Sequence, residues 1–356
     1  MLFQEPILQW LLQNGGFMDS QVFILNEKRN VTLTAYLQDD SQEFWRAKKR
    51  PAVVIFPGGA YAYCSDREAD PVAQEYLRAG YHTFVLRYSV GWENAVWPNP
   101  LEDYDQAMEL IAAHAKEWHL IPEKIAVIGF SAGGHLAACA ATMAKHRPAA
   151  AILAYPVILE GLAAICAKGA PGADKAVDSQ TCPCFIAATG TDTTVSAMNS
   201  LRFVEALYEN GISAELHLYA FGPHGFSTAR TSIADPAELC SRTLHWVEDS
   251  ISWLEDVFGA FTSGEMSSPR CPGRVRKDKD PYLSVDCLLA TIAENQMAVE
   301  RLNQLILVEE TTQKWIAEQK ENLLTSEMTL RSALQFLNVP GEVIRKADEI
   351  LSEIPN

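Results

Sequence analysis

Short apolar runs recur along the first part of the chain and restrict its fold more than any other pattern. PAVVIF (51–56), KIAVIGF (124–130) and CFIAAT (184–189) are almost uninterrupted. Such runs are typical of parallel strands that are covered on both faces. Two earlier runs, QVFIL (21–25) and VTLTAYL (31–37), alternate instead and lie too close together for a helix between them. They predict an antiparallel start to the same sheet.

Helical patterns separate the later runs. Residues 69–80, 101–118 and 199–211 repeat apolar side chains at steps of three and four, and 235–258 closes the series. In the third of them, Asn199 or Ser200 is the expected N-cap. The alternation predicts the α/β class, with a mostly parallel, doubly wound sheet. We assign residues 1–261 to this domain, with the folded part beginning near residue 18.

A composition change follows. Residues 262–282 are polar, charged and rich in proline, which predicts a linker, and residues 283–356 predict an all-α helical extension. In the extension, Leu283 to Leu324 reads as one long helical pattern with Asn295 at an apolar-seam position. Thr325 or Ser326 is expected to cap a second helix, and Pro340 to open a third. The seam must bury itself against its own shorter helices, the α/β domain or a second copy in a homo-oligomer.

Composition and charge limit the partners. The chain has 356 residues and a formal net charge of −16, which argues against nucleic acid and anionic membranes as partners. No run approaches the roughly 20 apolar residues of a membrane span. Residues 1–20 lack the basic and apolar regions of a signal peptide. The eight cysteines show neither CxxC nor zinc-ligand spacing, so we expect reduced thiols, a cytoplasmic location and no metal site.

One pentapeptide carries the main chemical signal. GFSAG, Gly129 to Gly133, matches G-x-S-x-G between a predicted strand and a predicted helix. Ser131 is expected on a sharp turn with strained backbone angles, so the residues two positions away on either side must be small. The turn places the N–H of Ala132 at a helix N-terminus, where it stabilises an oxyanion. His135 lies in the first helical turn, and we expect it to pack or to form structural hydrogen bonds.

A nucleophilic serine needs a base and an acid that orients the base, here in the chain order Ser, Asp, His. His224 lies in the glycine- and proline-rich loop AFGPHGFS after the last predicted strand, whereas His217 lies within that strand and His245 within a helix. Asp192 follows the strand 184–189 at its carboxyl end, while its competitors Asp174 and Asp178 precede that strand. We therefore predict His224 as the base and Asp192 as the acid.

Further site residues are expected on two loops. FPGGAY, residues 56–61, follows a predicted strand, and its glycines let backbone N–H groups approach a substrate oxygen. Gly59 and Ala60 are the predicted donors. Tyr61, Trp92 and Trp97 lie on loops that flank this site. Their rings are suited either to stacking on sugar rings or to packing in the interior, and both interpretations stay open.

Together the segments FPGGAY, WPNPLEDYDQAMELI, IPEKIAVIGFSAGGHLAA and AFGPHGFS resemble the serine esterases of the α/β-hydrolase superfamily. The resemblance covers roughly residues 20–255, and the most similar group is the acetylxylan-esterase-like and hormone-sensitive-lipase-like (BD-FAE-like) bacterial carboxylesterases. It implies the α/β-hydrolase fold, the triad Ser131, Asp192 and His224, and an oxyanion hole from Gly59, Ala60 and Ala132. Two departures stand out: relatives usually have glycine where Ala60 stands, and many have His-Gly where this chain has Thr189-Gly190.

The implied reaction is acyl transfer to water through an acyl-enzyme, without metal or cofactor. Residues 159–182, where lids are often inserted, are rich in alanine and glycine and too small for a large lipase lid. This favours an open site for a short acyl group, such as acetyl, on a bulky polar alcohol such as a xylo-oligosaccharide. Two alternatives are a serine exopeptidase of the same fold and a non-catalytic scaffold that acts through the helical tail.

Overall fold

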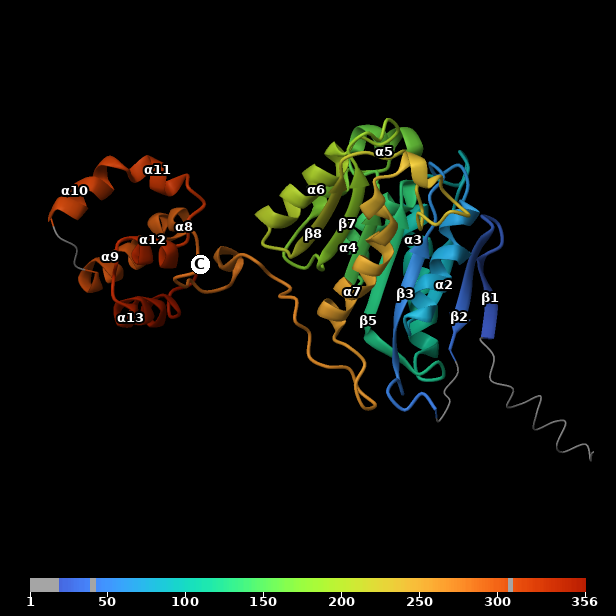
Figure 1. Ribbon diagram of the computed structural model, residues 1–356, viewed down its shortest axis with the longest axis horizontal. Coiled ribbons are helices and arrows are strands. Elements are labelled where there is room, and N and C mark those ends of the chain that lie inside the picture. The colour runs from blue at the N-terminus through green and yellow to red at the C-terminus, as the bar shows by residue number, and fades with distance from the viewer. Residues whose placement is uncertain (1–18, 39–42, 307–309) are drawn as a thin grey trace, which may run out of the picture. The chain divides into compact units, whose positions relative to one another are not determined.

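An eight-stranded sheet with the order β1-β2-β4-β3-β5-β6-β7-β8 forms the centre of the larger part of the chain (Figure 1). The computed structural model describes residues 19–38, 43–306 and 310–356. The residues 1–18 considered above lie outside these ranges. The strands are β1 (Asp19–Asn26), β2 (Val31–Leu37), β3 (Arg50–Phe56), β4 (His82–Arg87), β5 (Leu120–Phe130), β6 (Ala150–Ala154), β7 (Cys184–Thr189) and β8 (Ala214–Tyr219).

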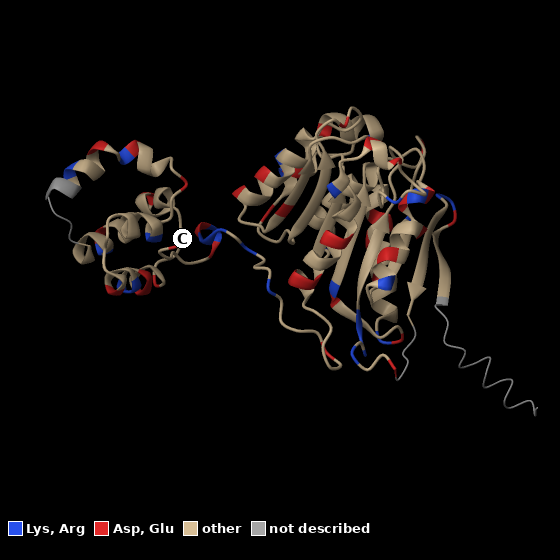
Figure 2. Cartoon of the chain, viewed as in Figure 1, with Lys and Arg blue, Asp and Glu red and all other residues tan. Residues whose placement is uncertain are grey.

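The strand directions confirm the predicted class. β1 and β2 are antiparallel to each other, β2 is antiparallel to β4, and all neighbours from β4 to β8 are parallel. β6 and β7 contain no charged residue, and β7, which Figure 1 labels, is tan in Figure 2. This composition fits strands with apolar layers on both faces.

Helices cover both faces. α2 (Asp70–Arg78) and α7 (Trp246–Phe258) share one buried core with residues such as Ile55 and Ile128. Neighbouring residues along a strand point to the opposite face, and there Phe56 packs edge-on against Tyr104 of α3 (Asn99–His114). α4 (Ala132–Met143) packs against β5, β6 and α3. The remaining helices of this part are α5 (Glu160–Cys166) and α6 (Met198–Glu209).

The chain divides into two compact units. One comprises Met1–Leu207 with Ser213–Gly273, and the other Tyr208–Ile212 with Arg274–Asn356. The second unit contains α8 (Leu289–Glu294), α9 (Gln296–Leu305), α10 (Glu310–Glu318), α11 (Lys320–Leu324), α12 (Leu330–Phe336) and α13 (Gly341–Leu351). It has a hydrophobic core of its own, drawn from Leu283 to Ile354. The apolar seam is therefore buried against its own short helices.

The prediction of one long helix from Leu283 to Leu324 is wrong. The chain becomes helical only at Leu289, and α8 ends before Asn295. There the backbone is extended and the side-chain oxygen of Asn295 accepts a hydrogen bond from the Ala298 N–H, which starts α9. An asparagine that caps a helix in this way competes with helix continuation, so the seam folds back instead of extending.

Two predicted caps are also wrong. α6 begins before Asn199, whose side-chain oxygen accepts from the N–H groups of Ile158 and Leu159 after β6. α12 is capped by Thr329, which accepts from the Ser332 N–H, and not by Thr325 or Ser326. In α6 the long-range contact occupies the side chain of Asn199, and in α12 a threonine nearer to the helix start takes the cap.

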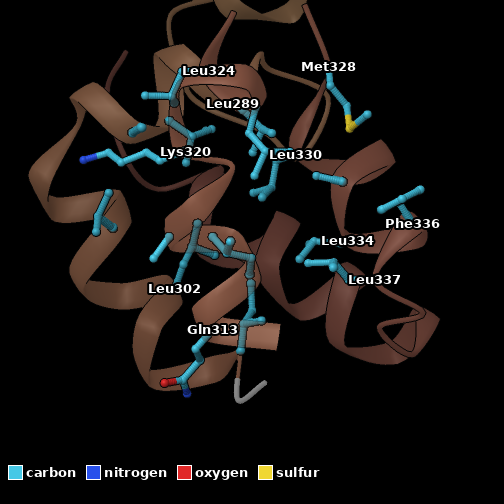
Figure 3. Close-up of a pocket in the computed structure, with 18 of the residues that line it drawn as sticks. Leu289, Leu302, Gln313, Lys320, Leu324, Met328, Leu330, Leu334, Phe336 and Leu337 are labelled. Carbon is cyan, nitrogen blue, oxygen red and sulfur yellow. The ribbon is translucent and has the colours of Figure 1, made fainter. Parts of the chain in front are cut away.

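The C-terminal unit contains a cavity of about 430 Å³, which is lined by residues from each of the helices α8 to α12. Figure 3 shows the apolar side chains that line it, among them Leu302, Leu330 and Leu334. Within the described ranges, no helix is both long and apolar enough to cross a membrane. All eight cysteines are free thiols.

Candidate active site

Ser131 lies on the turn between β5 and α4 at the carboxyl edge of the sheet. Its backbone angles, φ 53° and ψ −114°, confirm the strained elbow. A Cβ at Gly129 would overlap the carbonyl oxygen of Gly133, and one at Gly133 would overlap the carbonyl oxygen of Phe56. The turn can therefore form only with glycine at both positions. It is also tied to the strand beside it, since the Ser131 N–H donates to the Ala154 carbonyl at 3.0 Å.

His224 and Asp192 meet at this serine. The Nε2 of His224 lies 2.9 Å from the Oγ of Ser131, and its Nδ1 lies 2.6 Å from Oδ2 of Asp192. The other oxygen of Asp192 accepts from the N–H groups of Thr194 and Val195. Burial by itself would raise the pKa of Asp192, but the hydrogen bonds from His224 and from these backbone groups outweigh it and lower that pKa. An ionised Asp192 requires a proton on Nδ1 of His224, which leaves Nε2 free to accept the serine proton.

The loop of His224 is held to the end of β7 by threonine hydroxyls. Thr189 and Thr191 both donate to the carbonyl of Gly222, and the Gly222 N–H donates back to Thr191. Thr189 stands where many relatives were expected to have histidine. In this chain its hydroxyl connects the strand before Asp192 to the loop that carries His224.

The loop after β3 lies beside Ser131. A Cβ built on Gly58 would come within 3.1 Å of the Cβ of Ser131. Gly59 has φ +126° and Ala60 has φ 53°, so both have left-handed backbones. Such a conformation costs an L-residue roughly 1–2 kcal/mol, which explains why glycine is usual where Ala60 stands. Ala132 is the first residue of α4, so its N–H has no acceptor within the helix.

The competing residues have other partners. The Nδ1 of buried His135 lies 2.8 Å from the Tyr61 hydroxyl, and its Nε2 lies 2.8 Å from the carbonyl of Pro171, which confirms a hydrogen-bonding role. His217 contacts Glu215 on β8, and Asp178 forms a bidentate ion pair with Arg147. His245 is exposed just before α7.

The three aromatic candidates differ in exposure. Tyr61 is only 1% exposed and Trp97 is half-buried with its ring edge-on to His135, so these two pack inside the loop layer. Trp92 is 76% exposed. A fourth ring that sequence reasoning missed, that of Tyr63, is 61% exposed, and its N–H donates to the carbonyl of Gly59. The exposed aromatic ring next to the Gly59–Ala60 loop is therefore that of Tyr63 rather than that of Tyr61.

Two further residues, Glu68 and Tyr155, contact the loops of the site and were not singled out by the sequence. Glu68 accepts from the Gly58 N–H, and the Tyr155 ring lies edge-on to His224 with ring centroids 5.0 Å apart. No motif marks either residue, because each is defined by contacts between distant segments. Across the described ranges, no group of three or more His, Cys, Asp or Glu side chains is arranged to hold a metal ion.

Comparison with known proteins agrees with this architecture. A sequence profile of the BD-FAE family matches residues 43–157. Over 259 residues the chain is 30% identical to a Butyrivibrio fibrisolvens protein named endo-1,4-beta-xylanase B, covering 64% of this chain and 38% of that protein. It is 29% identical to the acetylxylan esterase of Xylanibacter ruminicola, covering 49% of this chain and 41% of that protein. The chain therefore spans about two fifths of the length of these curated relatives.

Solved structures are covered by this chain over almost their whole length. The acetyl ester-xyloside bifunctional hydrolase from Caldicellulosiruptor lactoaceticus is 28% identical with a TM-score of 0.59, covering 68% of this chain and 98% of that one. MGS-M1, an α/β hydrolase enzyme from a Medee basin deep-sea metagenome library, is 40% identical with a TM-score of 0.62, covering 68% of this chain and 98% of that one. The chain therefore belongs to the α/β-hydrolase superfamily.

Proposed function

We propose that this chain is a serine carboxylesterase that hydrolyses short acyl esters, acetyl above all, on carbohydrates such as xylo-oligosaccharides. The observation that carries the proposal is the continuous hydrogen-bonded line from Ser131 through His224 to Asp192, with distances of 2.9 and 2.6 Å. Two similar proteins whose names refer to acetyl esters and to xylan or xyloside support the choice of substrate class.

The reaction follows from this line. His224 takes the proton of Ser131 while Oγ attacks the ester carbonyl, and Asp192 stabilises the imidazolium that forms. The N–H groups of Ala132 and of the Gly59–Ala60 loop are the proposed donors to the oxyanion. His224 then gives the proton to the leaving alcohol. In the second half of the reaction, water attacks the acyl-enzyme and gives a proton to His224, which passes it to Ser131 Oγ as the carboxylic acid leaves.

The surroundings of the site support a short acyl group on a larger polar alcohol. Between β6 and β7 the chain forms only the seven-residue helix α5 and a four-residue 3-10 turn, Ala173–Ala176, which together make a small cover. The exposed rings of Tyr63 and Trp92 offer surfaces on which a sugar ring can stack.

The test is hydrolysis of 4-nitrophenyl esters of increasing acyl length and release of acetate from acetylated xylo-oligosaccharides. We expect the acetyl ester to be preferred, and Ser131→Ala to lower kcat by more than about 10⁴-fold. Because the variant removes only the hydroxyl, its circular dichroism spectrum should match the wild type. Equal and undetectable rates for both proteins would contradict the proposal and favour a scaffold; cleavage of aminoacyl anilides would instead favour an exopeptidase.

A further inference from the structure

Glu68 is a buried carboxylate next to the candidate active site, with only 3% of its surface exposed. It lies in a short 3-10 turn, Asp66–Glu68, just before α2. Its Oε2 accepts a hydrogen bond from the Gly58 N–H at 2.8 Å, and its Oε1 accepts one from the Tyr155 hydroxyl at 2.7 Å. Both carboxylate oxygens are therefore used, and each receives a donor from a different loop.

The first partner belongs to the loop that carries the proposed oxyanion donors. Gly58 directly precedes Gly59 and Ala60. It lies next to the serine, since a Cβ built on it would come within 3.1 Å of the Cβ of Ser131. The loop is closed by the Ser65 N–H, which donates to the Gly58 carbonyl at 2.9 Å. Because Glu68 accepts from the Gly58 N–H, the carboxylate determines how this peptide unit faces the nucleophile.

The second partner leads to the loop of the base. The Tyr155 oxygen accepts a hydrogen bond from the Ser227 N–H at 2.9 Å, three residues after His224. Ser227 is also held through its hydroxyl, which donates to the Arg67 carbonyl at 2.5 Å, and through its own carbonyl, which accepts from Trp246 Nε1 at 2.9 Å. The Tyr155 ring supports the imidazole of His224 from the side.

Both oxygens of the Glu68 side chain act as acceptors, which suits a carboxylate, since each of its oxygens can accept. Burial raises the pKa of Tyr155 well above its usual value, and the nearby Glu68 raises it further, so the hydroxyl remains a donor. A glutamine at position 68 has a single oxygen, so it can accept from Gly58 or from Tyr155 but not from both. With its oxygen turned to Gly58, the glutamine would present its NH2 group to Tyr155, and the buried Tyr155 hydroxyl would lose the acceptor of its proton.

We propose that Glu68 is a positioning residue that holds the oxyanion loop, through Gly58, and the loop of His224, through Tyr155 and Ser227, in one fixed arrangement around Ser131. The proposal rests on the proposed esterase function. A misplacement of about 1 Å in either loop would disturb the attack geometry, which can cost about 100-fold in rate.

The experiment compares Glu68→Gln and Tyr155→Phe with the wild type in steady-state hydrolysis of 4-nitrophenyl acetate. We expect kcat to fall about 10- to 100-fold in each with little change in KM, because the substrate still binds while the transition state is held less well. The double variant should lose little more than the worse single variant, since both changes break the same link. Affinity for a trifluoromethyl ketone, which forms a tetrahedral adduct with the serine, should fall in parallel with kcat/KM.

The matched control is Tyr76→Phe. The Tyr76 hydroxyl is equally buried and forms a 2.7 Å hydrogen bond with Ser250, but it joins α2 to α7 away from the site. It should lower the melting temperature about as much as Tyr155→Phe and leave kcat and ketone affinity unchanged. If Glu68→Gln does not fold, Tyr155→Phe decides alone.

Wild-type kcat and ketone affinity in folded Glu68→Gln or Tyr155→Phe would overturn the positioning role. So would equal losses in Tyr155→Phe and Tyr76→Phe, which would indicate a general effect of the missing hydroxyl. Failure of the esterase proposal gives a different result, namely no Ser131-dependent hydrolysis by the wild type.

Discussion

Burial decides what the individual histidines of this chain do. His135 and His224 both lie within reach of the elbow, yet His135 is completely buried and both of its ring nitrogens have partners. Since the Pro171 carbonyl can only accept, Nε2 carries the proton and Nδ1 accepts from Tyr61. Burial lowers the pKa of His135 to about 4, and burial has the same effect on His82.

Because of His135 and His82, we expect the stability of the protein to fall at acidic pH. Between about pH 4 and pH 6.5 the unfolded chain binds protons that the folded chain does not. The free energy of unfolding therefore rises with pH in this window, and the protein loses stability as the pH falls through it. A shift of this size corresponds to a loss on the order of 3 kcal/mol per histidine at the low end. Urea unfolding at pH 7.5, 6, 5 and 4.5 measures it.

The variant His135→Gln should flatten this dependence, because one of the two groups that take up protons on unfolding is gone. This variant will also be less stable than the wild type at pH 7.5. The result to compare is therefore the slope of the free energy of unfolding against pH, and not its value at one pH. His245→Gln, in an exposed position, controls for histidine removal in general. A wild-type slope in His135→Gln would contradict the assignment.

Among the elements, the elbow between β5 and α4 has the tightest requirement. Its geometry depends on close backbone contacts at Gly129 and Gly133, where an added Cβ would meet carbonyl oxygens that cannot move aside. Ser131 and the start of α4 are placed by these contacts. Glycine is needed here for space, because neither residue has a positive φ.

Gly133→Ala should therefore destabilise the protein by more than about 3 kcal/mol or prevent folding, since relief requires movement of the β3 end. Gly161→Ala in α5 is the matched control. A Cβ there meets nothing within 4 Å, and alanine is favoured over glycine in a helix by up to about 1 kcal/mol. Thermal unfolding of both variants measures the difference, and a Gly133→Ala protein as stable as the wild type would contradict the geometry.

At the scale of the whole molecule, the core that contains α7 and the core of the C-terminal unit share no residue among those that the structure describes. The core around β3, β5 and α7 ends at Phe258, and that of the C-terminal unit begins at Leu283. The match to MGS-M1 covers 98% of that protein and 68% of this chain. A region of that size is therefore enough to form the whole fold of MGS-M1. A core that lies within one unit does not need the other unit for its burial.

A protein that ends at Gly273 should therefore fold and hydrolyse 4-nitrophenyl acetate with an unchanged kcat/KM. The truncation leaves the end of α6 in place and removes α8 to α13. Analytical gel filtration and activity of the truncated and full-length proteins, measured side by side, provide the test. An aggregated or inactive truncated protein would mean that the C-terminal unit supports the site.

Local patterns in the sequence were sufficient for the strands, the class of the fold and the elbow. Apolar runs become buried strands whatever their neighbours, and the glycines around Ser131 report a backbone that only they allow. Chain order and strand ends pointed to Asp192 and His224, which the structure brings together at Ser131. The predictions of the strands, the fold class and the elbow succeeded because each depends on a few residues that are close together in the chain.

Tertiary structure decided the rest. Glu68 and Tyr155 are 87 positions apart, Asn199 bonds to the loop after β6 instead of capping its helix, and Tyr61 is buried while Tyr63 is exposed. The long helix predicted from Leu283 is divided at Asn295 because its apolar seam is buried against helices of the same unit. A polar side chain has several acceptable partners, and only the packing of distant segments determines which one lies within reach.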